Sequence, residues 1–331
     1  SLLILMGVSL IIEQGNLKQT IIPIGLLLIS ILLALSFDYQ SYSKIFTITL
    51  RILSINSLVA FFIALLFPEI IRMFPVLVNS VGTNAHVVGF SFVVLSANVR
   101  NWGIFWEPGA FQTFLVMVIL IEIHAKNKTS RKFIVIHMIA LLTTLSTVGF
   151  VSLVLIVIYL VISSGRFSQK LKYIIVATLF SILFFLLYVR NNPYLQYALF
   201  DKLLAMFDSN TTSGSAAVRQ DSIIYPTQKF LESPIFGVGA TGLEELEQIT
   251  GHTMNTFTPI NWFAKWGVFY GSMMIIGLWK YTKYLTIEKF KRFIVFGIIL
   301  ISVSTEEFST NPTFLIYPLL GLFYNQINVK N

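Results

Sequence analysis

Two arginines in this sequence stand in settings suited to binding phosphate oxygens. Arg100 opens the stretch RNWGIFWEPGAF over residues 100–111, and Arg219 follows TTSGSAAV, a run whose backbone amides could approach a ligand. The planar guanidinium of arginine can donate two parallel hydrogen bonds to a phosphate group, which the ammonium group of lysine cannot. The alternative for each arginine is a solvated or snorkelling loop charge, and spacing alone favours that alternative.

The same stretch places a carboxylate and several aromatic rings beside Arg100. Glu107 precedes a Pro-Gly pair at the expected start of a helix, so it is either an acid stabilised by the helix dipole or a general base. Trp102 and Trp106 belong either to an aromatic belt at a membrane interface or to a stacking platform for sugar rings. In both cases the structural alternative is the commoner one.

A second group of polar residues lies in and after TGHTMNTFTPINWFAKWG, residues 250–267. His252 is either an ordinary loop histidine or an acid–base group, because histidine titrates near neutral pH. Lys265 lies about two turns inside the next apolar tract, and an ionisable residue within a membrane span is a functional candidate by default. Glu306 and Glu307 are expected to lie in a solvated turn.

The composition is that of a membrane protein. Hydrophobic residues make up 56% of the 331 and charged residues 11%, with a mean hydropathy of +0.79, whereas soluble domains carry about 25% charged residues. The chain has no cysteine, and its four histidines do not fall at metal-ligand spacing. Disulfides and thiolate metal sites are therefore excluded, and a metal-dependent glycosyltransferase of the nucleotide-sugar kind is unsupported. We expect neither a metal nor a cofactor.

The apolar tracts predict an all-α polytopic membrane protein with about ten transmembrane helices. A partial tract at 2–12 indicates a truncated first helix, with further residues expected upstream, and it lacks the basic n-region of a signal peptide. A continuous helix over 133–164 would be about 48 Å long, too long for a hydrocarbon core of about 30 Å. We therefore predict two short helices there, joined by a turn at LSTVG (145–149). The nine remaining tracts are 20–37, 45–67, 110–125, 133–147, 149–164, 173–189, 259–279, 293–304 and 312–327.

The distribution of basic residues predicts which segments face the cytoplasm, because Lys and Arg collect in short cytoplasmic loops. One orientation places most of the 23 Lys and Arg residues inside. The segments 68–109 and 190–258 then face outward, as two long outer loops carrying short helices in a single transmembrane domain over 1–331. The inside segments are 38–44, 126–132, 165–172, 280–292 and the tail after 327.

The longer outer loop, 190–258, has a helical pattern of its own. Within 210–239, an apolar helical pattern follows Arg219 and ends at a Ser-Pro pair and a glycine turn. GLEELEQI (242–249) then predicts a short amphipathic helix. Loops of this length in compact proteins are usually functional or disordered.

Several of these motifs resemble one protein family. RNWGIFWEPGAF resembles the Arg, Gly-Ile-Phe, Glu-Pro-Gly segment common in bacterial O-antigen and capsule polymerases of the Wzy type. LLTTLSTVGFVSLVLIVIYLV (141–161) is similar to the paired-helix segment of the O-antigen polymerase/ligase superfamily. VRQDSIIYPTQKFLESPIFGVGATG (218–242), followed by MNTFTPINWFAKWGVFYG (254–271), resembles the large loop of that superfamily. In this order the motifs span roughly residues 95–325.

The resemblance implies a metal-independent integral-membrane glycosyltransferase in the bacterial cytoplasmic membrane. Such an enzyme would polymerise undecaprenyl-pyrophosphate-linked oligosaccharide repeat units into surface polysaccharide on the periplasmic or extracellular side. Family members often have a histidine directly before the Asn of the helix-entry segment, where this chain has Met254, so His252 departs from the pattern. The residues expected to be catalytic are Arg100, Arg219, Glu107 and His252. Those expected to bind substrate are Trp102, Trp106, Asn255 and Lys265.

The implied partners are undecaprenyl-pyrophosphate-linked glycans, membrane lipids and a chain-length regulator protein, with no nucleic acid. Two other activities stay open. One is an O-antigen ligase that transfers the finished glycan to lipid A core or another acceptor. The other is a lipid-linked oligosaccharide flippase or transporter, which should show polar residues at the bilayer midplane and repeated halves. The sequence shows neither feature.

Overall fold

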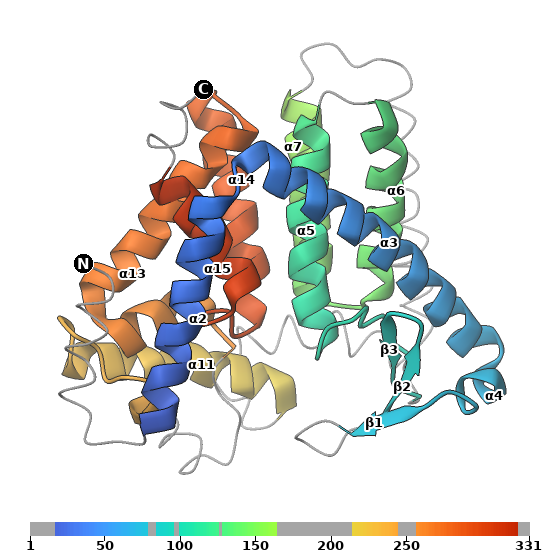
Figure 1. Cartoon of the computed structure of the whole chain (residues 1–331), viewed down its shortest axis with the longest axis horizontal. Coiled ribbons are helices and arrows are strands. Elements are labelled where there is room, and N and C mark those ends of the chain that lie inside the picture. The colour runs from blue at the N-terminus through green and yellow to red at the C-terminus, as the bar shows by residue number, and fades with distance from the viewer. Residues whose placement is uncertain are drawn as a thin grey trace. The chain divides into compact units, whose positions relative to one another are not determined.

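A computed structural model describes residues 17–78, 84–95, 99–125, 128–163, 214–243 and 256–323 of the chain. The fold is mostly helical, as the sequence predicts (Figure 1). Residue contacts divide the chain into two compact units, one of Ser1–Ser43 with Asp208–Asn331 and the other of Lys44–Phe207.

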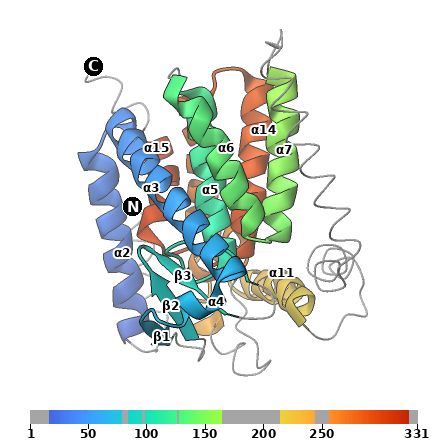
Figure 2. The same ribbon diagram turned by 90° about the vertical axis from the view of Figure 1, so that its right-hand side faces the viewer.

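The unit of residues 44–207 contains a group of three neighbouring helices, α5, α6 and α7 (Figure 2). Every residue of α5 from Pro108 to Glu122 is buried, as expected for a helix that is largely apolar on all sides. The described elements of this unit are most of α3 (Tyr39–Leu66), α4 (Pro68–Ile71), β1 (Val76–Val78), β2 (Asn84–Val88), β3 (Ser91–Val93), α5 (Pro108–His124), α6 (Lys128–Thr143) and α7 (Thr147–Ser163).

A small antiparallel sheet occupies part of the predicted outer loop 68–109, where the sequence analysis expected only short helices. Its three strands lie in the order β1-β2-β3, with Leu77 opposite Ala85 and Val87 opposite Phe92. Valine-rich runs favour strands, and Gly89 supplies the positive φ (60°) of the turn between β2 and β3.

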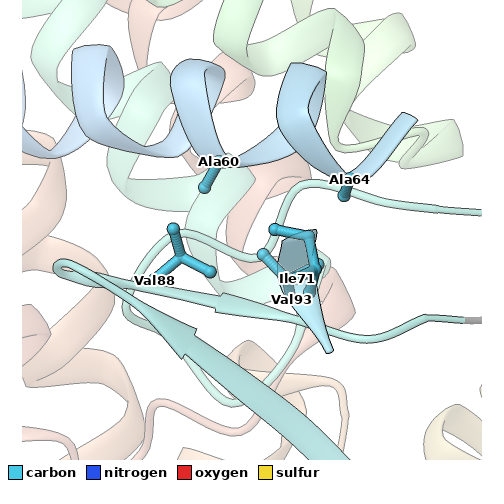
Figure 3. Packing of buried hydrophobic residues seen from close by; sticks show 5 residues of the cluster. All are labelled: Ala60, Ala64, Ile71, Val88 and Val93. Atoms are coloured by element: carbon cyan, nitrogen blue, oxygen red, sulfur yellow. The ribbon is translucent and has the colours of Figure 1, made fainter. Parts of the chain in front are cut away.

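A hydrophobic cluster fixes this sheet to the end of α3. The buried side chains come from α3, α4, β2 and β3, and they face one another as Figure 3 shows. Phe74 and Leu95 pack against the cluster from the edges. The sheet and the C-terminal end of α3 therefore form one packed body, whose central residues are Ala60, Ala64, Ile71, Val88 and Val93.

The predicted pair of short helices in 133–164 is confirmed, with a small shift in the turn. α6 ends at Thr143 and α7 begins at Thr147, so the turn covers 144–146 instead of 145–149. The hydroxyl of Ser146 accepts a hydrogen bond from the N–H of Gly149 (3.3 Å). This N-terminal capping bond explains why α7 starts before the glycine.

The other unit is organised around α13 (Thr258–Leu285), which packs against α11 (Gly214–Glu232), α14 (Lys289–Ser302) and α15 (Pro312–Leu322). The short η2 (Val303–Thr305) follows α14, and α2 (Leu17–Ser36) packs against α15. The backbones of α13 and α15 cross in close contact, because a Cβ added at Gly321 would collide with the carbonyl oxygen of Gly277.

Asp38 separates α2 from α3 and caps the second helix. Its carboxylate accepts a hydrogen bond from the N–H of Ser41 (2.8 Å). Hydrogen bonds from the side chain and the backbone of Ser41 lower the pKa of Asp38. This cap lets two apolar helices follow each other with only a short break.

Most predicted apolar tracts coincide with helices, although only one described helix, Tyr39–Leu66, is long and apolar enough to cross a membrane. The tracts at 2–12 and 173–189 and most of the predicted helix 242–249 lie outside the described residues. The number of membrane spans and the single transmembrane domain stay predictions. Shorter apolar helices run over Ile21–Ser36, Pro108–His124, Thr147–Val161 and Pro312–Leu322.

Candidate functional site

Arg100 is held against the turn between α6 and α7. Its Nε donates to the carbonyl oxygen of Thr144 (3.0 Å) and its Nη2 to that of Leu145 (3.3 Å). The carbonyl groups at the end of a helix have no partner within that helix, and a basic side chain there satisfies them. The guanidinium charge therefore has a fixed place, and two motifs far apart in the sequence are in direct contact.

The neighbouring Asn101 was not singled out from the sequence, yet it links three segments. Its amide Nδ2 donates to the hydroxyls of Ser57 in α3 (3.2 Å) and Thr143 in α6 (2.9 Å). Its backbone N–H donates to the carbonyl of Thr143 (3.0 Å), and its Oδ1 accepts from the N–H of Gly103 (3.1 Å). Asn101 is buried, so it anchors the loop that carries Arg100.

The aromatic residues of the same loop divide into an inner and an outer set. Phe105 stacks on Phe111 and Phe114, with ring centroids 5.5 and 4.7 Å apart. Trp106 is 44% exposed, and Trp102 is half-buried. Of the two tryptophans, Trp106 has the more accessible ring and is the better placed for stacking with a ligand.

Glu107 is an exposed carboxylate at the start of α5. It occupies the N-cap position, but its side chain makes no capping hydrogen bond there, and Pro108 follows as the first helical residue. The positive end of the helix dipole stabilises its negative charge. Arg100, Trp102, Trp106 and Glu107 thus share one loop, with Trp106 and Glu107 facing outward.

Helix α13 is broken where the sequence showed only a continuous apolar tract. Gly267 has φ 78° and ψ 178°, which interrupts the helical hydrogen bonding. The turn PIFGVG (234–239) fills the break, and both Gly237 and Gly239 have positive φ. Backbone groups of α13 that lose their helical partners at the break form hydrogen bonds with the turn instead. These bonds are Val238 N–H to Ala264 O (2.8 Å), Gly239 N–H to Lys265 O (3.0 Å) and Val268 N–H to Pro234 O (2.8 Å).

Lys265 lies at this break and pairs with Glu307. The Nζ of Lys265 is 3.3 Å from Oε1 of Glu307, and the two side chains are 9% and 27% exposed. The Glu307 carboxylate also accepts hydrogen bonds from the amide of Asn261 and from the hydroxyl and N–H of Ser309. The positive charge of Lys265 is therefore compensated inside the fold.

The expectation of a solvated turn at Glu306 and Glu307 was wrong. Glu306 is buried, and its carbonyl oxygen accepts a hydrogen bond from the hydroxyl of Thr258 (2.5 Å). The same hydroxyl accepts from the N–H of Phe308 (2.8 Å). The segment after η2 is thus fastened to the start of α13, which brings Glu307 to Lys265.

The remaining expected site residues are only partly described. Arg219 lies in α11, but its side chain is outside the described residues, as are His252 and Asn255. Arg219 and Arg100 belong to different units. One turn after Arg219, the hydroxyl of the buried Ser222 accepts a hydrogen bond from that of Thr256 (3.1 Å). The helix that carries Arg219 therefore contacts the chain directly after Asn255.

A buried charged cluster in the unit of 44–207 was missed by sequence reasoning. Arg51 donates from Nε and Nη2 to the two carboxylate oxygens of Glu122 (2.8 and 3.1 Å), and its guanidinium lies 4.4 Å from the ring centroid of Phe133. His137 Nε2 is 3.9 Å from Glu122, and its Nδ1 is 2.8 Å from the hydroxyl of Ser54. The side chains of Glu122 and His137 are both fully buried.

Comparisons of the chain with protein-family models, with curated proteins and with solved structures find no match. Within the described ranges, no group of three or more His, Cys, Asp or Glu residues is arranged to hold a metal ion. The motifs and the contacts between them are therefore the features that bear on function.

Proposed function

We propose that the protein is an integral-membrane glycosyltransferase that polymerises undecaprenyl-pyrophosphate-linked repeat units on the outer face of the bacterial cytoplasmic membrane. The observation that carries this proposal is that motifs resembling the family contact each other although they are distant in the sequence. The Arg100 loop lies against the turn of the paired helices, and the PIFGVG turn fills the break in α13. Each contact joins two of the motifs that resemble the family within one unit.

The membrane location is supported by the outward faces of α2 and α3. On α3, one side is buried, while large aliphatic and aromatic side chains recur every three or four residues on the other. A soluble surface rarely carries a continuous apolar stripe of this length, whereas lipid requires one. The exposed stripe consists of Ile45, Ile48, Ile52, Ile55, Val59 and Phe62, and α2 adds Ile21, Ile22, Leu28, Ile29, Leu32 and Leu35.

The finer architecture, with about ten spans and with 68–109 and 190–258 outside, is part of the same proposal. α5 and α7 each have 17 residues, about 26 Å at 1.5 Å per residue. That length falls slightly short of a core of about 30 Å, and helices of this size can span by local thinning of the bilayer.

The proposed reaction transfers the growing glycan from its lipid pyrophosphate to a fresh repeat unit. An acceptor hydroxyl oxygen attacks the anomeric carbon of the donor sugar, and the bond from that carbon to the pyrophosphate oxygen breaks. Arg100 and Arg219 stabilise the negative charge of the departing lipid pyrophosphate. Glu107 or His252 receives the proton of the acceptor hydroxyl. No metal takes part, and the partners are the lipid-linked glycans, membrane lipids and a chain-length regulator.

Trp106 and Lys265 are proposed to bind the substrate through different interactions. The exposed ring of Trp106 and the half-buried ring of Trp102 stack with sugars near Arg100. Because Glu307 compensates the charge of Lys265, that site suits neutral sugar hydroxyls better than phosphate. Asn255 is assigned to substrate binding from the resemblance alone.

Replacing Arg100 or Arg219 by lysine is expected to lower polymerisation by roughly 10- to 150-fold, because a charge-assisted hydrogen bond contributes about 1.5–3 kcal/mol. Arg72→Lys is the matched control, since Arg72 is exposed and, within the described part of the chain, its ion-pair partner is the neighbouring, likewise exposed Glu69. Polymer length on gels at equal expression measures the effect.

A thermal unfolding midpoint for each variant separates substrate binding from support of the fold. Arg100 also holds the turn at Thr144 and Leu145. If its role were purely structural, the Arg100→Lys variant would lose activity only as far as its unfolding midpoint fell. Activity lost at an unchanged midpoint supports the proposal. Wild-type ladders from both lysine variants would refute the role assigned to the two arginines.

The buried Arg51–Glu122–His137 cluster favours a transporter as the second candidate. Paired ionisable residues inside helices are typical of proton or substrate pathways in transporters. The sequence pattern alone did not indicate polar residues of this kind. A flippase would move lipid-linked oligosaccharide without changing its length, whereas a polymerase lengthens it and a ligase moves it to a different acceptor.

Reconstitution tests the proposal directly. The purified chain in lipid vesicles, supplied with lipid-linked repeat units from the source bacterium, is expected to form a ladder of glycans in the presence of EDTA. A ladder that appears only after Mg²⁺ or Mn²⁺ is added would contradict metal independence. Unchanged single repeat units in every condition would contradict the polymerase.

A further inference from the structure

The segment from the end of α3 through β1 carries a second apolar surface that the proposed reaction does not use. From Leu66 to Val78 most residues are exposed, and many of those are large and apolar. Met73 is 84% exposed and Val78 64%. We call this surface the apron: Phe67, Ile70, Met73, Val76, Leu77 and Val78, with Phe90 from the neighbouring turn.

We propose that the apron lies in the headgroup region of the outer leaflet and binds the lipid surface. This inference rests on the membrane location in the proposed function. The apolar stripe of α3 continues without interruption through Leu65 and Leu66 into the apron. A surface that faces lipid along the helix is thus prolonged beyond the end of the helix.

The arrangement of β1 favours lipid over a protein partner. Successive strand residues point to opposite faces, yet Val76, Leu77 and Val78 are all exposed. A docked protein would cover one face or the edge of the strand, whereas a lipid surface can surround both faces.

The polar groups beside the apron side chains can be solvated in the headgroup region but not in the hydrocarbon core. β1 is an edge strand, and its outward backbone groups need water or another hydrogen-bonding partner, which the hydrocarbon core lacks. Glu69 in α4 and Arg72, the residue that follows this helix, form an ion pair, with side chains 76% and 63% exposed. Mixed apolar and charged side chains are characteristic of segments at the membrane interface.

The apron is also connected to the loop that carries Arg100. The hydrophobic cluster joins α4, β2 and β3 to α3, and the N–H of Phe92 in β3 donates to the carbonyl oxygen of Gly103 (2.7 Å). Binding of the apron to headgroups would hold this loop at the depth of a lipid-linked pyrophosphate.

Site-directed spin labelling can measure the depth, because the chain has no cysteine of its own. Single cysteines at Met73, Leu77 and Val78 are labelled in the full chain, which is placed in phosphatidylethanolamine/phosphatidylglycerol vesicles. Ile52 in the α3 stripe is the lipid reference, and a dissolved label is the aqueous reference. Collisions with oxygen and with a water-soluble nickel complex then report the depth of each label.

The apron labels are expected to have depth values between those of the dissolved label and of Ile52, with measurable oxygen access. Aqueous values at all three sites, with Ile52 in lipid, would overturn the apron but leave the membrane location standing. Low access to both oxygen and nickel would indicate a protein partner and also overturn it. An aqueous value at Ile52 would instead refute the membrane location itself.

Discussion

Replacing Gly267 by alanine is expected to destabilise the fold by about 2 kcal/mol or more. The backbone at Gly267, with φ 78° and ψ 178°, lies in a region that only glycine adopts readily, and other residues there cost about 1–3 kcal/mol. A Cβ would also stand 2.5 Å from the carbonyl carbon of Ile235 and 2.8 Å from the N of Phe236. Both are backbone atoms of the PIFGVG turn, so no side chain can move aside.

Gly297 in α14 offers a matched control. A Cβ there meets nothing within 4 Å, and alanine is favoured over glycine in a helix by about 1 kcal/mol. Gly297→Ala is therefore expected to be neutral or slightly stabilising. Thermal unfolding in detergent, followed by size-exclusion chromatography, compares the two variants. Equal midpoints would show that the turn does not support the break in α13.

Replacing Glu122 by glutamine is expected to have the second large effect, a loss of about 3 kcal/mol in the free energy of unfolding. Removing one partner of a buried ion pair leaves the other charge uncompensated, which typically costs about 3–5 kcal/mol. The Glu122 side chain is fully buried and that of Arg51 is 18% exposed, so the lower end of the range applies.

A double variant separates this ion pair from general disturbance of the core. Arg51→Met combined with Glu122→Gln removes both charges and is expected to recover much of the loss. Glu69→Gln serves as the control, because the exposed Glu69–Arg72 pair should contribute only about 0–1 kcal/mol. Denaturant unfolding midpoints compare the stability of the wild type and the three variants. A double variant no more stable than Glu122→Gln would argue against a pairwise interaction.

The helices of the fold were predictable from apolar tracts and from length arithmetic. A turn was predicted at 145–149 because the apolar tract is too long for one span. The observed turn at 144–146 lies slightly earlier because Ser146 caps α7. The sheet in 68–109 was not foreseen, because three short valine-containing strands carry little periodicity. The break at Gly267 was also missed, since hydropathy does not report a positive φ.

The candidate site was harder to predict, because its partners are distant in sequence. Arg100, Glu107 and the two tryptophans share one short stretch, so their proximity could be predicted. The partner of Lys265 is Glu307, which reaches it only because Thr258 fastens the segment after η2. Likewise, Arg51, Glu122 and His137 come from three different helices, and no local pattern joins them.

The most direct test of the proposed function is the state of the lipid-linked glycans after deletion of this chain in the organism that encodes it. A polymerase predicts that single repeat units on undecaprenyl pyrophosphate accumulate at the outer face, and that surface glycans shrink to one repeat unit. Restoring the wild-type chain should restore the ladder. Long polymers retained on the lipid would indicate a ligase, single units retained at the inner face would indicate a flippase, and either result would contradict the polymerase.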